Sequence, residues 1–205
     1  MFDLPPPDPG IEISIASRGI SKGIAQTDGA QVIGKALVQF GDVQLAGQWK
    51  NVTSTVAEGE AAASASWQHK FGRVQTSLGA TFKFQTGVSG PTDDKALELN
   101  GSVAPKWGKF GLRASAVYSP NDFGSTGQSL YVESGASYDL SKAVRLSANI
   151  GRRKREGSQD YTSFNAGLSV TWKKLTLDAR YFDTAQSEYG EIYKERLVVT
   201  GRLSL

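Results

Sequence analysis

The sequence predicts an all-β fold: a transmembrane, antiparallel, up-and-down β-barrel of about 12 strands, with short periplasmic turns and longer extracellular loops. Two observations point to this class. Apolar and polar residues alternate over stretches of about ten residues, which is the period of a β-strand. These stretches are also long, because strands of soluble proteins usually have about five or six residues, whereas a tilted strand needs about nine to eleven to cross a bilayer.

The expected strands follow this alternation along the whole chain. Residues 74–84 illustrate it, since Leu78 and Phe82 fall on one face while Gln75 and Lys83 fall on the other. The same pattern predicts strands at 11–20, 31–40, 43–53, 60–71, 74–85, 96–107, 110–119, 129–140, 143–153, 161–172, 175–184 and 193–205.

The connections between these strands are alternately short and long. Short turns occur at Phe40-Gly41-Asp42, Phe71-Gly72-Arg73 and Trp107-Gly108-Lys109, with similar turns at 140–142 and 172–174. They recur every 31 to 36 residues, as a hairpin repeat of two strands and one longer loop requires. An aromatic residue beside a short turn is typical of the girdle at the periplasmic interface. A soluble sandwich or a lipocalin-like barrel is the alternative, but the charged polar face favours the membrane barrel.

Composition limits the organisation and the chemistry. The sequence predicts a flexible proline-rich tail at residues 1–10, without the features of a signal peptide, and a single barrel domain at 11–205. It contains no Cys, one His and one Met, which excludes disulfides, thiolate metal sites and thiol catalysis. No run of about 18 apolar residues is present, so no transmembrane helix is expected.

One short signature resembles a known family. Residues 18–21 (Arg-Gly-Ile-Ser) and 26–29 (Gln-Thr-Asp-Gly) precede a hairpin that turns at Phe40-Gly41. This combination resembles the first hairpin of the TorF-type porins of Gram-negative bacteria, in which the two elements run together, whereas residues 22–25 separate them here. The resemblance covers about twenty residues. It implies a transport barrel in the bacterial outer membrane and supplies no catalytic residues.

The polar face predicts the character of the lumen. The residues expected to line a pore are Arg18, Lys35, Lys50, Lys83, Glu98, Arg113, Glu133, Arg145, Asp178, Arg180, Arg196 and Arg202. The same alternation turns Lys70, Lys106, Arg153, Glu12, Glu60 and Asp139 inward, which gives twelve basic against six acidic residues. Because rings of Arg and Lys favour anions, we expect a porin-like channel for small hydrophilic, preferentially anionic solutes. The alternative is a closed structural or interaction barrel, in which opposite charges pair across the lumen.

Catalysis and cofactors are not expected. The single His69 is in phase with Trp67 and Phe71, so it should face the interface rather than a serine partner. One His and no Cys leave only scattered carboxylates for a metal. The sequence therefore predicts neither an enzyme, nor a cofactor, nor a metal site.

A basic run at 152–155 suggests a lipid partner. Counted from the turn at 141–142, this run emerges at the extracellular rim, with Arg152 and Lys154 outward and Arg153 inward. We expect Arg152 and Lys154 to bind lipopolysaccharide phosphates, because clustered guanidinium and ammonium groups suit phosphate oxygens. The alternative is a solvated loop flank. A nucleic-acid partner is not expected in a barrel.

Overall fold

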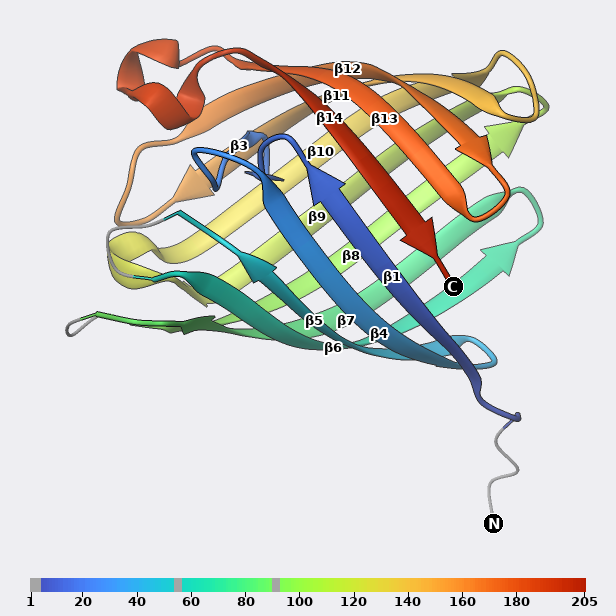
Figure 1. Ribbon diagram of the computed structural model, residues 1–205, viewed down its shortest axis with the longest axis horizontal. Helices are drawn as coiled ribbons and strands as arrows, with labels where there is room; N and C mark the ends of the chain where they lie inside the picture. The colour runs from blue at the N-terminus through green and yellow to red at the C-terminus, as the bar shows by residue number, and fades with distance from the viewer. Residues whose placement is uncertain (1–4, 54–56, 90–92) are drawn as a thin grey trace.

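The computed structural model describes residues 5–53, 57–89 and 93–205 and forms a closed antiparallel β-barrel of twelve strands (Figure 1). Two shorter strands, β2 and β3, form a separate hairpin. The barrel strands are β1 (Asp8–Ala16), β4 (Gln31–Phe40), β5 (Val43–Asn51), β6 (Gly59–Phe71), β7 (Val74–Thr86), β8 (Lys95–Trp107), β9 (Phe110–Asp122), β10 (Gly127–Asp139), β11 (Val144–Arg155), β12 (Tyr161–Trp172), β13 (Leu175–Thr184) and β14 (Arg196–Ser204).

The barrel closes through its first strand. β1 pairs with β4 on one side and with β14 on the other, and every other barrel strand pairs with its neighbours in the sequence. In the described residues, closure leaves the barrel sheet without an unpaired edge, which is the condition for a β-structure to cross a bilayer. No helix in the described part of the chain is both long and apolar enough to cross a membrane.

All twelve predicted barrel strands are present, and their ends agree with the observed ones to within about four residues. β1 begins at Asp8, within the segment predicted as a flexible tail, and it ends at Ala16 instead of residue 20. β14 begins at Arg196 instead of 193, because Glu191–Tyr193 forms a turn of 3-10 helix (η3). Residues 1–4 of the predicted tail lie outside the described residues.

Five tight turns lie together at one end of the barrel, which we call the turn end, and the opposite end is the loop end (Figure 1). Gly41, Gly72 and Gly108 adopt positive φ angles of 57°, 59° and 58°, which a residue without a Cβ reaches at no steric cost. The aromatic residues beside two of the turns, Phe71 and Trp107, are 57% and 47% exposed on the outer surface. β1 begins and β14 ends at the turn end.

The outer surface is apolar and the interior is polar. In β1, for example, Ile13 and Ile15 are exposed outward, whereas Ser14 is buried inside the barrel. In β7, Leu78 is 61% exposed, whereas the side chain of Lys83 on the opposite face is 14% exposed and lies among other charges. The predicted orientation of these strands is confirmed.

The segment between β1 and β4, residues 17–30, folds into the loop end of the barrel, and we call it the inserted segment (Figure 1). It contains a hairpin of β2 (Ile20–Ser21) and β3 (Ile24–Ala25). The two loop residues have φ angles of 50° (Lys22) and 86° (Gly23), and positive φ at both positions is typical of a type I′ turn.

The inserted segment is seated against β12, which follows β14 and β13 around the barrel from β1. A Cβ added to Gly23 would lie 2.2 Å from the Cβ of Ser163 on β12, so only glycine fits there. Ile24 forms a small apolar cluster with Tyr161 and Tyr193, whose rings meet edge to face with centroids 5.4 Å apart. These contacts fix the hairpin inside the barrel.

Candidate functional site: a charge network above a basic vestibule

Cations and carboxylates alternate from strand to strand around the interior of the loop end. Lys50 on β5 lies 3.1 Å from Glu60 on β6. Lys83 on β7 lies 3.6 Å from Glu60 and 2.9 Å from Glu98 on β8. On the other side, Arg153 on β11 pairs with Asp122 on β9. Together with Lys22, these residues form what we call the loop-end network: Lys22, Lys50, Glu60, Lys83, Glu98, Asp122 and Arg153.

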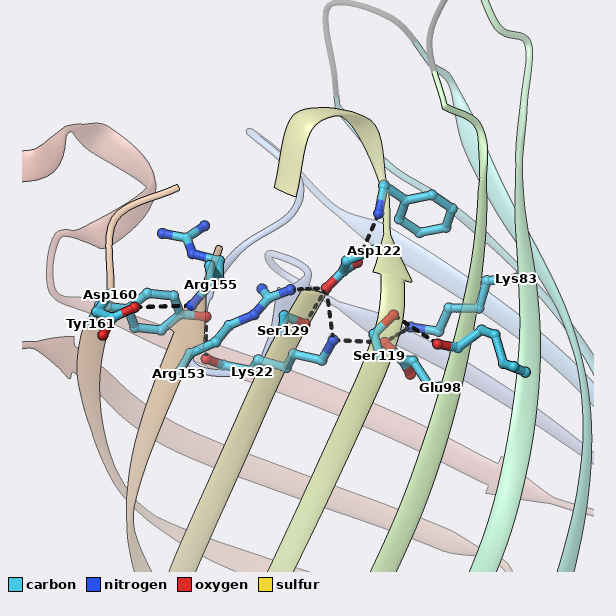
Figure 2. Close-up of polar contacts among 12 residues, drawn as sticks. Lys22, Lys83, Glu98, Ser119, Asp122, Ser129, Arg153, Arg155, Asp160 and Tyr161 are labelled. Atoms are coloured by element: carbon cyan, nitrogen blue, oxygen red, sulfur yellow. Dashed lines mark hydrogen bonds and ion pairs between the residues drawn. The ribbon is translucent and has the colours of Figure 1, made fainter. Parts of the chain in front are cut away.

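Lys22 completes the alternation (Figure 2). Glu98 and Asp122 lie on neighbouring strands, and the Lys22 ammonium reaches between them, 2.6 Å from Glu98 Oε1 and 3.6 Å from Asp122 Oδ2. Burial lowers the pKa of Lys22 and the neighbouring Arg153 acts in the same direction, whereas the two carboxylates oppose this shift. The two carboxylates therefore help Lys22 to remain charged.

A β-bulge brings Asp122 into this network. Leu97 on β8 pairs with Asn121 on β9, whereas Leu99 pairs with Tyr118, so β9 has one extra residue at this point. The extra residue reverses the alternation, and Asp122 is 5% exposed inside the barrel. Without the bulge, Asp122 would share the outward face of Tyr118.

Bonds that do not involve the Lys22 ammonium also tether the inserted segment. The hydroxyl of Tyr161 donates to the backbone carbonyl of Lys22 at 2.8 Å. Lys50 Nζ donates to Gln26 Oε1 at 2.7 Å, and within the segment the amide N–H of Gly19 donates to the Thr27 hydroxyl at 2.7 Å. The hairpin is therefore anchored through its backbone as well as through the charge at its tip.

The other half of the lumen is a cavity of about 780 Å³ that reaches to the turn end, and we call it the basic vestibule. Seven basic side chains and one carboxylate line it: Lys70, Arg73, Lys106, Arg113, Arg145, Arg180, Arg202 and Glu133. Two further carboxylates pair with lining residues, because Asp139 lies 2.6 Å from both Lys106 and Arg145, and Asp178 lies 3.2 Å from Arg180. The cations still exceed the carboxylates by seven to three.

The guanidinium groups of the vestibule differ in how they are held. Arg180 is fixed, since it donates to Asn165 and Ser147 at 2.7 Å each besides its pair with Asp178. Arg113 and Arg202 form no ion pair with any of the described residues, so their charge is not neutralised within that part of the chain. Such groups attract anions.

Nine of the twelve residues predicted to line a pore lie in or beside these two regions. Lys50, Lys83 and Glu98 belong to the loop-end network. The others line or adjoin the vestibule, namely Arg113, Glu133, Arg145, Asp178, Arg180 and Arg202.

Three predicted residues lie apart from both regions. Arg18 donates to the backbone carbonyl of Asp28 within the inserted segment. Lys35 on β4 lies 3.6 Å from Glu12 on β1. Arg196, at the loop end of β14, donates to backbone carbonyls that follow η2 (Ser187–Tyr189), and it has no carboxylate partner among the described residues.

Two residues of the network were not predicted. Lys22 was assigned to a loop, and Asp122 lay beyond the predicted end of its strand. The Lys22-Gly23 dipeptide between Ile20-Ser21 and Ile24-Ala25 was a signal for a hairpin tip. No local signal placed that tip inside the barrel.

The basic run at the loop end has the predicted alternation. Arg152 and Lys154 are exposed on the outer surface, whereas Arg153 is buried in the network. Arg152 donates to the Thr162 hydroxyl at 3.1 Å and lies 3.6 Å from Asp160. Lys154 has no ion-pair partner in the described part of the chain. The predicted lipopolysaccharide contact remains a proposal.

His69 lies on the outer surface near the turn end. Its ring stacks on Trp67 with centroids 5.6 Å apart, and its Nδ1 lies 2.6 Å from Asp42 Oδ2. The predicted outward position is confirmed. In the described residues, no three His, Asp or Glu side chains gather in an arrangement that could hold a metal ion.

The closed barrel, its short turns at one end and its polar interior are the features of outer-membrane β-barrels. A KdgM porin superimposes with a TM-score of 0.68 at 12% identity, over 96% of this chain and 99% of that chain. A NanC porin superimposes with a TM-score of 0.63 at 6% identity, over 95% and 97%. LpxR from Salmonella typhimurium gives 0.52 at 8% identity, over 96% and 99%.

At such low identities the likeness is one of fold. No protein-family model and no curated protein matches the chain. The resemblance of residues 18–29 to TorF-type porins therefore stays a prediction, whereas the likeness to porin barrels in general is established by the structure.

Proposed function

We propose that the chain is a channel of the bacterial outer membrane. The outward faces of its strands carry large apolar side chains such as Leu78, Phe82 and Leu177, which are 61%, 46% and 50% exposed. A continuous apolar band of this kind is covered by lipid in membrane barrels, whereas it would promote association in water. The aromatic residues near the tight turns mark one interface, which we assign to the periplasmic side.

The channel favours small hydrophilic anions. The observation that carries this proposal is the basic vestibule, in which cations exceed carboxylates by seven to three. Basic side chains lower the electrostatic barrier for an anion inside a low-dielectric wall. One of the similar structures is a KdgM porin in complex with disordered oligogalacturonate, an acidic oligosaccharide. That complex supports an anionic solute class for this barrel as well.

Ion selectivity tests the proposal. Arg113, Arg145 and Arg180 are changed together to Glu, and the reversal potential is measured in a planar lipid bilayer under a KCl gradient. We expect a wild-type preference for chloride that shifts toward potassium in the variant, because the vestibule would then carry a net negative charge. A matched variant changes Lys142 and Lys174, at the turn end, to Glu and should retain most of the chloride preference.

A closed barrel is the second candidate function. The loop-end network and the inserted segment favour it, because both lie inside the barrel at the end opposite the turn end (Figure 2). Such a barrel would display its loops to a partner and conduct nothing. The same bilayer measurement separates the two functions, since complete absence of conductance contradicts the channel and supports the closed barrel.

We also propose that the outward rim at the loop end contacts lipopolysaccharide. Arg152 and Lys154 point away from the lumen and lie at the end of β11, where the outer leaflet would present its phosphates. Guanidinium and ammonium groups bind phosphate oxygens through charge-assisted hydrogen bonds. The carboxylate of Asp160 already pairs with the Arg152 guanidinium, so we expect Arg152 to contribute modestly to the affinity for lipopolysaccharide.

A further inference from the structure

The inserted segment places a single charge at the centre of the loop-end network. Its anchoring on β12 brings the Lys22 ammonium to Glu98 and Asp122, and the Lys22 side chain is only 11% exposed. The backbone at Lys22 has a φ of 50°, which a residue with a Cβ adopts at a cost. A costly backbone conformation that delivers a buried charge to two carboxylates indicates that this charge has a role.

Lys22 sets the sign of the network. With Lys22 the network contains four cations and three carboxylates, and without it three of each would remain. Removal of the Lys22 charge would act mainly on Glu98 and Asp122. These carboxylates lie on neighbouring strands and would have no cation between them. Each would keep one cationic partner, Lys83 or Arg153. The lumen at this level would therefore change from net positive to neutral.

We propose that Lys22 is the residue that determines charge selectivity at the loop end of the channel. This inference rests on the proposed channel function and deepens it by naming the residue that acts at the level of the inserted segment. A solute that crosses the barrel must pass the inserted segment before or after it passes the basic vestibule. A positive charge at this level favours an anion, and the vestibule alone would favour an anion only over half of the path.

The charge of Lys22 can be removed without removing the contacts that hold the hairpin in place. The Tyr161 hydroxyl binds the carbonyl of Lys22 rather than its side chain, and Gln26 and Thr27 are held by other partners. Gly23, which approaches Ser163 most closely, is not altered when Lys22 is replaced. Substitution of Lys22 should thus change the charge while the hairpin keeps its place.

The experiment compares wild type with Lys22→Gln, Lys22→Glu and Lys22→Arg in planar bilayers under a KCl gradient. We expect the chloride-to-potassium permeability ratio to fall several-fold in Lys22→Gln, to fall further in Lys22→Glu, and to stay near the wild-type value in Lys22→Arg. Lys142→Gln, a lysine at the turn end outside the network, serves as the matched control. Heat-modifiable migration in detergent verifies that each variant has a folded barrel.

The outcomes separate this inference from the function on which it rests. Conductance with an unchanged reversal potential in Lys22→Gln and Lys22→Glu overturns the inference and leaves the channel function intact. A larger conductance with unchanged selectivity identifies the hairpin as a plug, and it overturns the inference as well. Absence of conductance in wild type and in all variants overturns the channel function and the inference together.

Discussion

The two halves of the lumen carry similar residue types in different arrangements. At the loop end, charges alternate from strand to strand, lie close together and are almost fully buried, with Glu60 at 4% and Glu98 at 8% exposed. In the basic vestibule, cations predominate and line an open cavity, and Arg113 is exposed. The comparison indicates that the charges at the loop end contribute to stability as well as to the field in the lumen, whereas those of the vestibule face water and contribute mainly to the field that a solute meets.

This difference has an energetic basis. A buried charge is tolerated only when its partners compensate for lost hydration, so removing one member of a buried pair leaves the other uncompensated. An exposed charge keeps its hydration and contributes little to stability, but its field extends into the lumen. Stability and selectivity should therefore respond differently to substitutions in the two halves.

The largest expected effect is on stability. Glu98→Gln removes the carboxylate shared by Lys22 and Lys83, and we expect it to lower the free energy of unfolding by about 3 kcal/mol. Glu133→Gln is the matched change in the vestibule, where Glu133 accepts a hydrogen bond from Tyr131, and it should cost about 1 kcal/mol or less. Urea-induced unfolding of barrels folded into liposomes measures both. Equal losses would remove the distinction between the two halves.

The second-largest expected effect is that of salt concentration on ion selectivity, which should differ between the two halves of the lumen. The Debye length falls from about 10 Å at 0.1 M salt to about 3 Å at 1 M, and exposed charges are screened more than buried ones. We expect the selectivity change caused by Arg113→Gln to disappear at 1 M KCl, whereas the change caused by Lys22→Gln persists. Reversal potentials at both concentrations provide the measurement. If both changes vanish at 1 M KCl, the network is as accessible to ions as the vestibule.

The smallest expected effect concerns the outside of the loop end. Changing Arg152 and Lys154 to Ser should reduce co-purifying lipopolysaccharide and lower its stabilising effect by about 2 °C in Tm, since a contribution near 1 kcal/mol shifts Tm by about 2–4 °C at this size. Lys142 and Lys174, at the turn end, are changed to Ser as the control. Identical lipopolysaccharide content and Tm in the two double variants would contradict the proposed contact.

The sequence was sufficient for the barrel wall because strand alternation is a local property. Leu78 and Lys83 belong to opposite faces in any strand of period two, and the same rule located all twelve barrel strands. It also placed Lys83 and Glu98 inside, and the structure brings them within 2.9 Å. The pairing itself needs the register between β7 and β8, which alternation does not supply.

The parts that could not be predicted depend on distant contacts. Asp122 points inward only because a bulge shifts β9 relative to β8. Lys22 enters the network only because its segment is seated on Tyr161, 139 positions further along the chain. Neither event leaves a pattern within a short window of sequence. The centre of the candidate site was therefore missed, while its surrounding wall was predicted.

The seat of the inserted segment also bears on how the molecule is built. Residues 17–30 join the first two strands of the barrel wall, but Ser163 and Tyr161, which receive their tip, belong to the tenth. The inserted segment therefore cannot reach its final position until β12 has formed. Contacts between such distant positions in the sequence form slowly. A partly assembled barrel would lack both its closing strand pair, β1 with β14, and the complete seat of the hairpin. The loop-end network is thus completed only when the last strands have assembled, so a partly assembled barrel would be leakier than the folded protein.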